Sequence, residues 1–464
     1  MMKMISIKNT IVVAGLAGIL LSCNTSRQFS RETVDTKGLY GDIVTSDSVS
    51  IADKPWQELF TDLHLQNLIR EGLDNNLDLQ VAVQRVLEAE AYFAQGKAAF
   101  FPSLSAQGAY AHVRNPETLY PAGPRHVDDY QLNMQASWEV DIWGKLRSSK
   151  KAAYANLLAS EAGRKAVQTS LVSGIAGTYY GLLALDEQLE ITRQTVENDK
   201  ELVETMSILK ESGQVTGAAV VQTEAVRYAA EVTLPDQAQA IRETENALCL
   251  MLGRTPGKIE RGRLSNQQTP ELVNTGIPSQ LLDNRPDVMQ AEYAVMSAFE
   301  MTRNARSYFY PALNITASAG LEAADLDDLL DADAFLLNVV GGLTAPIFNK
   351  RANKTRLEVA KAQQEEALLS FRNALLNAGQ EVNNALGQFD TSDKKILLRQ
   401  QQLDALEKSV SYTKELLHYG SATYTEVLNA QQSLLAAQLS NVNDHLEKLT
   451  STVSLYRALG GGWK

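Results

Sequence analysis

The sequence predicts a mainly α-helical protein in which long antiparallel helices are joined to four strands of a membrane β-barrel. Three observations predict this fold class: a proline-free coiled-coil segment from Ala352 to Leu417, four amphipathic strand patterns, and an internal repeat at an offset of about 207 residues. Together they indicate long rods attached to a small sheet rather than an ordinary globular domain.

The segment 352–417 has the periodicity of a coiled coil. Positions separated by alternating steps of three and four are mostly apolar, among them Val382, Leu403 and Val410. A 3.5-residue repeat sustained over this length is typical of a coiled-coil seam. At about 1.5 Å per residue the segment would form a rod on the order of 100 Å long. The stretch 419–434 is predicted to turn the chain into a second, antiparallel helix.

Four stretches have the alternation of amphipathic strands. Residues 130–141 and 313–321 alternate apolar and polar side chains without exception, whereas 104–113 and 335–345 alternate less cleanly. One apolar face and about 9 to 12 residues are typical of membrane barrel strands. A soluble sandwich would explain any one strand, but not four at repeat-equivalent places between long helices.

The chain is predicted to be a tandem duplication. Gly213 matches Gly420 at an offset of 207, as do the Leu-Gly pairs that end the last helix of each half. We therefore expect two structural repeats, 56–262 and 263–464, each with a helix, two strands, a very long helix, a turn and a helix. Pro235 should kink or break the corresponding helix of the first repeat.

Four strands cannot enclose a lumen, because the smallest membrane barrels use about eight. An open edge in lipid would leave backbone groups unsatisfied at a cost of several kcal/mol each. The barrel is therefore predicted to be shared between chains. Three copies would give twelve strands and a water-filled lumen, whereas two would give eight and a lumen filled by side chains.

The first 22 residues have the features of a secretion signal. Lys3 and Lys8 precede an apolar run, which ends in Leu-Leu-Ser before Cys23. This resembles a bacterial lipoprotein signal, so 1–22 would be removed and Cys23 acylated, with residues 23–55 as a tether. The alternative is an ordinary signal or anchor with an incidental cysteine. Asn24 in place of Asp argues against retention at the inner membrane.

The sequence offers no catalytic or metal-binding motif. Its five histidines never fall in zinc-protease spacings, and Cys249 has no cysteine partner for zinc. The acidic segment 325–333 lacks the glycine and terminal glutamate of an EF-hand, so it is predicted to be a solvated loop. A net charge of −12 makes nucleic acid an unfavourable partner. We expect no enzyme activity, cofactor or bound metal.

Several short motifs occur along the chain in a characteristic order and spacing. They are Trp56-x-x-x-Phe60, Asn76-Leu-Asp-Leu, Asp141-Ile-Trp-Gly-Lys145, Leu282-Asp-Asn-Arg-Pro-Asp287, Leu428-Asn-Ala-Gln-Gln-Ser-Leu434 and the terminal segment from Tyr456 to Trp463. In these motifs the chain, from Cys23 onward, resembles the TolC-like outer-membrane efflux family, in particular the acylated factors of resistance-nodulation-division pumps. The resemblance implies a homotrimer with a twelve-stranded barrel in outer-membrane lipid and a helical tunnel across the periplasm, whose tip meets a periplasmic adaptor protein and an inner-membrane resistance-nodulation-division transporter.

The resemblance also implies a gate at the tunnel tip, after the hairpin turn. Glu426 keeps the first acid of the family pattern, Asn429 replaces the second, and Gln432 stands where some relatives carry Arg. An Asp–Arg lock is therefore absent there. Glu426 is expected to line the constriction, which the packing of Val427 and Leu428 would close, with Asn429 and Gln432 hydrogen-bonding between chains. The alternative is that Glu426 is a solvated residue facing outward.

The expected function is a passive outer-membrane exit duct for drugs or other small molecules, with the pump supplying the energy. A duct for type I protein secretion is the first alternative, because it uses the same fold. A periplasmic coiled-coil scaffold without a channel is the second, but it leaves the alternating strands unexplained. The sequence does not identify the exported substrate.

Overall fold

The structure, a computed structural model, describes residues 29–30, 38–41, 50–116, 118, 124–268, 275–276 and 278–464. The predicted signal 1–22, Cys23 and most of the predicted tether 23–55 lie outside these residues. The chain divides into a short unit, Met1–Asp35, and a large unit, Thr36–Lys464. All helices and strands named below belong to the large unit.

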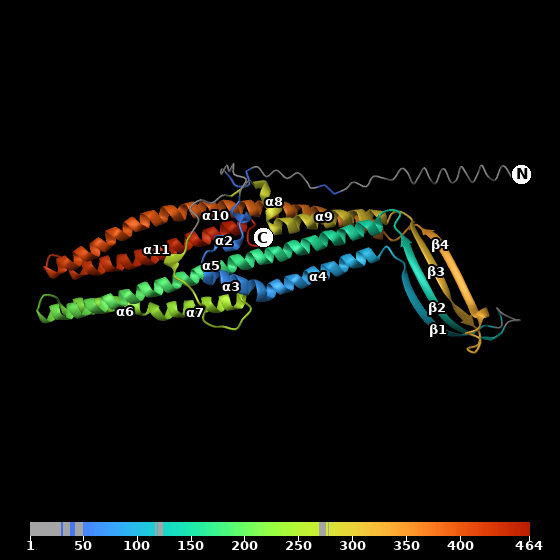
Figure 1. The fold of residues 1–464 in the computed structure, drawn as a ribbon, viewed down its shortest axis with the longest axis horizontal. Helices are drawn as coiled ribbons and strands as arrows, with labels where there is room; N and C mark the ends of the chain where they lie inside the picture. Colours follow the sequence, from blue (N-terminus) through green and yellow to red (C-terminus); the bar gives the residue numbers. More distant parts are fainter. Residues whose placement is uncertain are drawn as a thin grey trace. The chain divides into compact units, whose positions relative to one another are not determined.

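Helices make up most of the large unit (Figure 1). The first repeat contains α2 (Trp56–Leu59), α3 (Leu63–Asn75), α4 (Leu77–Ala98), α5 (Lys145–Glu211), α6 (Gly217–Glu231) and α7 (Thr233–Met251). The second contains α8 (Leu281–Asn284), α9 (Pro286–Ser307), α10 (Ala352–His418) and α11 (Tyr424–Ala458). Short 3₁₀ turns are η1 (Ile51–Asp53), η2 (Leu264–Asn266), η3 (Pro278–Gln280) and η4 (Ala332–Ala334).

The two repeats have matching elements. Helices α5 and α10 both contain 67 residues, and α4 and α9 both contain 22. The single helix α11 corresponds to the pair α6 and α7, which are separated at Val232. Pro235 accounts for this break, because its ring would clash with the carbonyl of Glu231 in a continuous helix. The predicted interruption at Pro235 and the tandem repeat are confirmed.

The sheet is antiparallel with the strand order β1-β2-β3-β4. The strands are β1 (Ser103–Arg114), β2 (His126–Val140), β3 (Ala312–Ala323) and β4 (Phe335–Thr344). Residues directly opposite one another in a sheet point to the same face. Leu321 lies between Leu132 and Phe335, and Ala319 lies between Met134 and Leu337. One face of β2, β3 and β4 is therefore apolar, as the alternation predicts, although Leu336 and Val340 of β4 lie on the other face, opposite Gly320 and Thr316.

The long helices pack around α5, which contacts α3, α4, α6, α7, α9 and α11. Its fully buried side chains include Ile175, Tyr179 and Leu182. Helix α10 packs on α11 and α9, and its predicted seam is confirmed. All seam positions from Leu368 to Thr413 are buried or half-buried. Among the residues that the structure describes, no helix has the length and apolar character needed to cross a membrane.

Buried Arg285 links the start of α9 to α10 and to the C-terminal end of α11. Its guanidinium donates to the carboxylate of Glu381 at 2.8 Å and to the backbone carbonyl of Ala458 at 3.0 Å. It also pairs with Asp287. Burial lowers the pKa of Arg285, but the carboxylates of Asp287 and Glu381 outweigh this effect and raise it above its ordinary value. The Arg-Pro-Asp motif therefore fixes where α9, α10 and α11 meet.

Candidate functional site at the helical tip

Two hairpin turns, 212–216 between α5 and α6 and 419–423 between α10 and α11, form what we call the helical tip. Figure 1 shows both turns at the end of the helices opposite the sheet. They are equivalent in the two repeats. Gly213 and Gly420 adopt positive φ angles of 73° and 68°, a conformation that glycine reaches without a Cβ clash. In each, the glycine N–H donates to a carbonyl of the preceding helix, Lys210 or Leu417, as in glycine helix caps.

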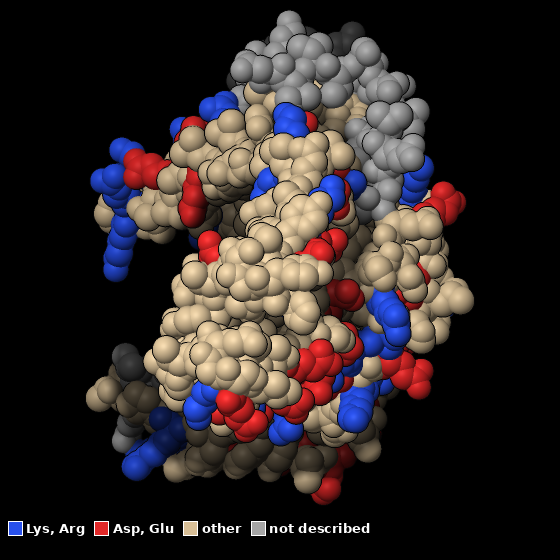
Figure 2. Space-filling model, turned by 90° about the vertical axis from the view of Figure 1, so that its left-hand side faces the viewer, with Lys and Arg blue, Asp and Glu red and all other residues tan. Residues whose placement is uncertain are grey.

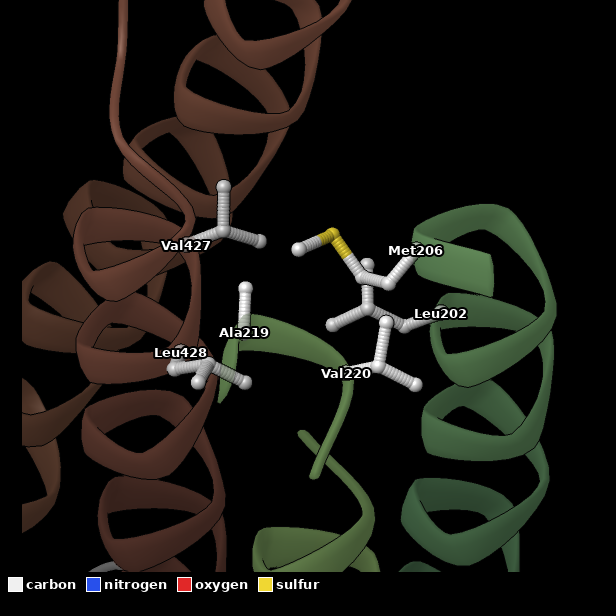
Figure 3. Close-up of a cluster of buried hydrophobic side chains, with 6 residues drawn as sticks. All are labelled: Leu202, Met206, Ala219, Val220, Val427 and Leu428. Carbon is white, nitrogen blue, oxygen red and sulfur yellow. The ribbon is translucent and has the colours of Figure 1, made fainter. Parts of the chain in front are cut away.

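The two turns are joined by an apolar cluster within one chain. Figure 3 shows its six buried side chains, contributed by α5, α6 and α11. They are Leu202, Met206, Ala219, Val220, Val427 and Leu428. A hydrogen bond of 3.1 Å from the Tyr424 hydroxyl to Gln222 adds a polar link at the edge of this cluster. The two hairpins therefore pack together within one chain.

Leu428 packs within its own chain. The side chain of Val427 is fully buried and that of Leu428 is 4% exposed, and both pack against α5 and α6. An apolar side chain already covered by its own chain cannot also pack against its copies in neighbouring chains. Leu428 therefore joins the two hairpins of one chain instead of sealing a contact between chains. The sequence missed this because the partner surface lies on α5 and α6, about 200 residues earlier in the chain.

Glu426 caps the first turn of α11. Its carboxylate accepts hydrogen bonds from the backbone N–H of Thr423 at 2.7 Å and from the Thr423 hydroxyl at 3.2 Å. A carboxylate in this position satisfies a free N–H group and interacts favourably with the helix dipole. The side chain remains exposed. Glu426 therefore has a structural role in the cap besides any role that its charge has at the tip.

Asn429 and Gln432 lie on the exposed side of α11 together with Glu426. Their spacing of three residues places them along one helix face, whereas Leu428 points to the buried side. The structure thus brings Glu426, Asn429 and Gln432 together on one surface, as the sequence pattern predicts. Figure 2, which looks onto the end of the molecule that carries the tip, shows acidic and basic side chains interspersed at this end.

The buried carboxylate of Asp199 on α5 has no distinguishing pattern in the sequence. Asp199 is 3% exposed, and burial raises its pKa to about 6, an effect that the nearby charge of Lys414 partly offsets. Lys414 and Asn198 line a cavity of about 280 Å³ between α5, α10 and α11, together with Gln431. Asp199 is buried by helices that pack around α5, so its position in a helical pattern gives no signal.

Further from the tip, ion pairs tie α10 to α11. Asp444 is almost fully buried and accepts from Arg399 at 2.8 Å and from Lys395 at 3.1 Å. Burial raises the pKa of the Asp444 carboxyl, but these two hydrogen bonds outweigh it and hold the pKa below its ordinary value. The pairs fix the register of the two helices above the turn.

The tip has no arrangement typical of catalysis. Among the residues that the structure describes, no three His, Cys, Asp or Glu side chains are grouped to hold a metal ion. The tip has an exposed polar face on α11 and an apolar cluster that joins the two hairpins. Long helices connect the hairpins to the sheet.

The family model for "Outer membrane efflux protein" matches twice, at residues 68–254 and 277–461. The chain is 30% identical to the cation efflux system protein CusC of Escherichia coli O6:H1 over 415 residues, which cover 88% of each chain. It is also 30% identical to the toluene efflux pump outer membrane protein TtgI of Pseudomonas putida, over 91% of each chain. A crystal structure of CusC has a TM-score of 0.86 at 26% identity and covers 95% of this chain and 100% of its own. The chain thus belongs to the outer membrane efflux protein family, and its paired hairpins and four strands are those of an outer-membrane exit duct.

Proposed function

We propose that three copies of this chain assemble into a passive duct of a tripartite efflux system, which releases small molecules at the cell surface. The single observation that carries the proposal is the sheet. One face is apolar across β2, β3 and β4, and β1 and β4 each pair with one strand among the residues that the structure describes. Three such sheets joined at these edges give a closed barrel of twelve strands with polar side chains toward a water-filled lumen.

The helical tip would then meet the other two components. A periplasmic adaptor protein and an inner-membrane resistance-nodulation-division transporter are the proposed partners, and the transporter supplies the energy. The names of two relatives describe efflux of cations and of toluene. These names favour a small-molecule or ion pump over type I protein secretion. They also describe very different cargoes, which supports a lumen that does not itself select the substrate.

Cys23 is the proposed attachment point for lipid. The segment Leu-Leu-Ser-Cys after an apolar run supports this assignment. A single acyl chain anchors a protein weakly, whereas a triacylated cysteine anchors it firmly, and here the barrel would also hold the protein in place. The lipid would therefore serve delivery to the outer membrane more than retention in it.

The proposed constriction is formed by Glu426, Asn429 and Gln432. Their common exposed face on α11 supports this assignment. Three Glu426 carboxylates around one axis would attract cations, while Asn429 and Gln432 would hydrogen-bond between chains. Leu428 contributes by holding the hairpins of each chain together.

The charge of Glu426 can be tested apart from its structural role. Glutamine at this position keeps the acceptor oxygen that caps Thr423 but removes three charges from the trimer. We expect Glu426→Gln to lower the cation-to-anion permeability ratio at least about twofold, because fixed charges at a constriction set its ion preference. The ratio is measured from reversal potentials in planar bilayers under a salt gradient.

The matched control is Glu415→Gln, which removes an exposed carboxylate of α10 close to the same turn. It should leave the permeability ratio within experimental error of the wild type. An unchanged permeability ratio in Glu426→Gln would show that Glu426 does not line the pore. A wild-type protein that does not conduct at all would contradict the proposed duct.

A further inference from the structure

Two histidines and an aspartate gather at the end of β1 and β2 that lies away from the helices. In the strand register His112 is paired with Asp128, and His126 lies two residues before it on the same face. His112 Nδ1 lies 2.7 Å from Asp128 Oδ1. The Tyr110 hydroxyl donates to the same carboxylate oxygen at 2.8 Å. His126 Nδ1 lies 3.3 Å from His112 Nε2.

Asp128 fixes the orientation and tautomer of His112. An ionised carboxylate can only accept hydrogen bonds, so Nδ1 of His112 carries the proton in this contact. Nε2 of His112 is then left with its lone pair directed toward His126. A carboxylate that holds a histidine in this way fixes the orientation of the ring and leaves the other nitrogen available, as it does for histidines that bind metals.

The distance between the two histidines matches that of two ligands on one ion. Two nitrogens bound to a tetrahedral ion at about 2.0–2.1 Å are roughly 3.3–3.4 Å apart, and His112 Nε2 and His126 Nδ1 are 3.3 Å apart. The ring planes differ by 24° with centroids 5.3 Å apart. In the absence of an ion this contact is a hydrogen bond between the two stacked rings, which a bound ion would replace.

We propose that His112 and His126 bind a divalent transition-metal ion, with Asp128 as the residue that positions His112. Imidazole suits Cu²⁺, Zn²⁺ and Ni²⁺. Because no three acidic, cysteine or histidine side chains are grouped as ligands among the described residues, water completes the coordination shell. The site holds an ion at the surface of the sheet, and it is separate from the helical tip and its constriction.

The position of the pair keeps it open to solvent. On the apolar face of β2, the span from Tyr130 to Trp138 is about 26 Å long, close to the roughly 25 Å apolar band of membrane barrels. The rings of Tyr110 and Tyr130 contact each other at 4.8 Å at one end of this band. His112, with 46% of its side chain exposed, lies beyond that end. The pair is thus on the water side of the aromatic residues.

Charges around the pair act in both directions. The segment 325–333, which connects β3 and β4 at this end of the sheet, carries five aspartates, and their field raises the local cation concentration. Arg114 is paired with His126 in the register and disfavours a cation there. Arg114→Gln should therefore strengthen metal binding.

The test uses full-length protein in detergent, purified without a polyhistidine tag and titrated with Cu²⁺. We expect one tight Cu²⁺ per chain by calorimetry and an electron paramagnetic resonance spectrum with coupling to two imidazole nitrogens. His112→Gln or His126→Gln should weaken this binding at least about tenfold and remove one nitrogen coupling. Asp128→Asn should weaken it about 10- to 100-fold, as for residues that orient metal-binding histidines.

Two matched variants separate the site from general effects. His64→Gln removes an exposed histidine of α3 and should leave the titration unchanged. Tyr110→Phe removes the other hydrogen bond to Asp128 without touching His112 and should change the affinity less than about twofold. Wild-type binding in the His112→Gln/His126→Gln double variant, or no tight Cu²⁺ in the wild type, would overturn the proposal. Conductance of the double variant is expected to be unchanged, so either result leaves the proposed duct unaffected.

Discussion

Asp199 shows how a single side chain can make the tip sensitive to pH. Its folded-state pKa of about 6 lies above the ordinary value of 3.8, so the folded chain holds this proton more tightly than the unfolded chain. Stability contributed by the protonated form is present at low pH and is lost as pH rises toward and through 6. At neutral pH the buried charge opposes the packing of α5 against the second repeat.

We expect Asp199→Asn to stabilise the tip at pH 8 by about 1 to 2 kcal/mol, because it removes a buried charge. The difference from the wild type should shrink as pH falls and should vanish near pH 4. Hydrogen exchange of the amides around residue 199, measured at several pH values, tests this. Asp404→Asn, which changes an exposed acid of α10, serves as the control. Equal stabilisation by Asp199→Asn at pH 4 and pH 8 would show that charge is not the cause.

At the residue scale, the sequence predicts which helix face a residue lies on better than it predicts which residues surround it. Glu426, Asn429 and Gln432 were placed correctly on one helix face because 3.6-residue periodicity fixes that relation within a helix. The sequence does not show what Leu428 packs against or that Asp199 is buried, since their surroundings come from helices far away in the chain. Local periodicity does not determine whether an apolar side chain packs against its own chain or against another copy.

At the scale of elements, the joint between the two hairpins depends on a small apolar cluster. Leu428→Ala should lower the free energy of local opening at the tip by about 2 to 4 kcal/mol, because a fully buried leucine is replaced and a cavity remains. Hydrogen-exchange mass spectrometry should show faster exchange in residues 217–231 and 424–434. Both segments should respond together, since the cluster joins them.

The control for this change is Leu397→Ala, at a leucine of α10 that is 70% exposed. It should leave exchange at the tip unaltered. Faster exchange confined to 424–434 in Leu428→Ala would mean that the hairpins are not joined through this cluster. The elements themselves were largely predictable, because a 3.5-residue seam and a two-residue alternation each specify one structure over many residues.

At the scale of the whole molecule, the four-stranded sheet requires other copies of the chain. We expect native mass spectrometry in detergent to show a trimer, because three sheets give twelve strands around a water-filled lumen. Each chain should have the mass of the sequence from Cys23 plus acyl groups. Cys23→Ser should lose the added mass yet still form trimers. A conducting monomer, or a stable dimer, would contradict the proposed assembly.

The two repeats of the chain have matching helices, but these helices differ in where they can bend. In the second half α11 is one unbroken helix of 35 residues, whereas the matching part of the first half is jointed at Val232. An unbroken helix resists bending along its whole length, while a break in the hydrogen-bond ladder concentrates flexure at one point. Bending of the hairpin helices is therefore expected at Val232 in the first repeat, whereas the matching part of α11 should stay straight.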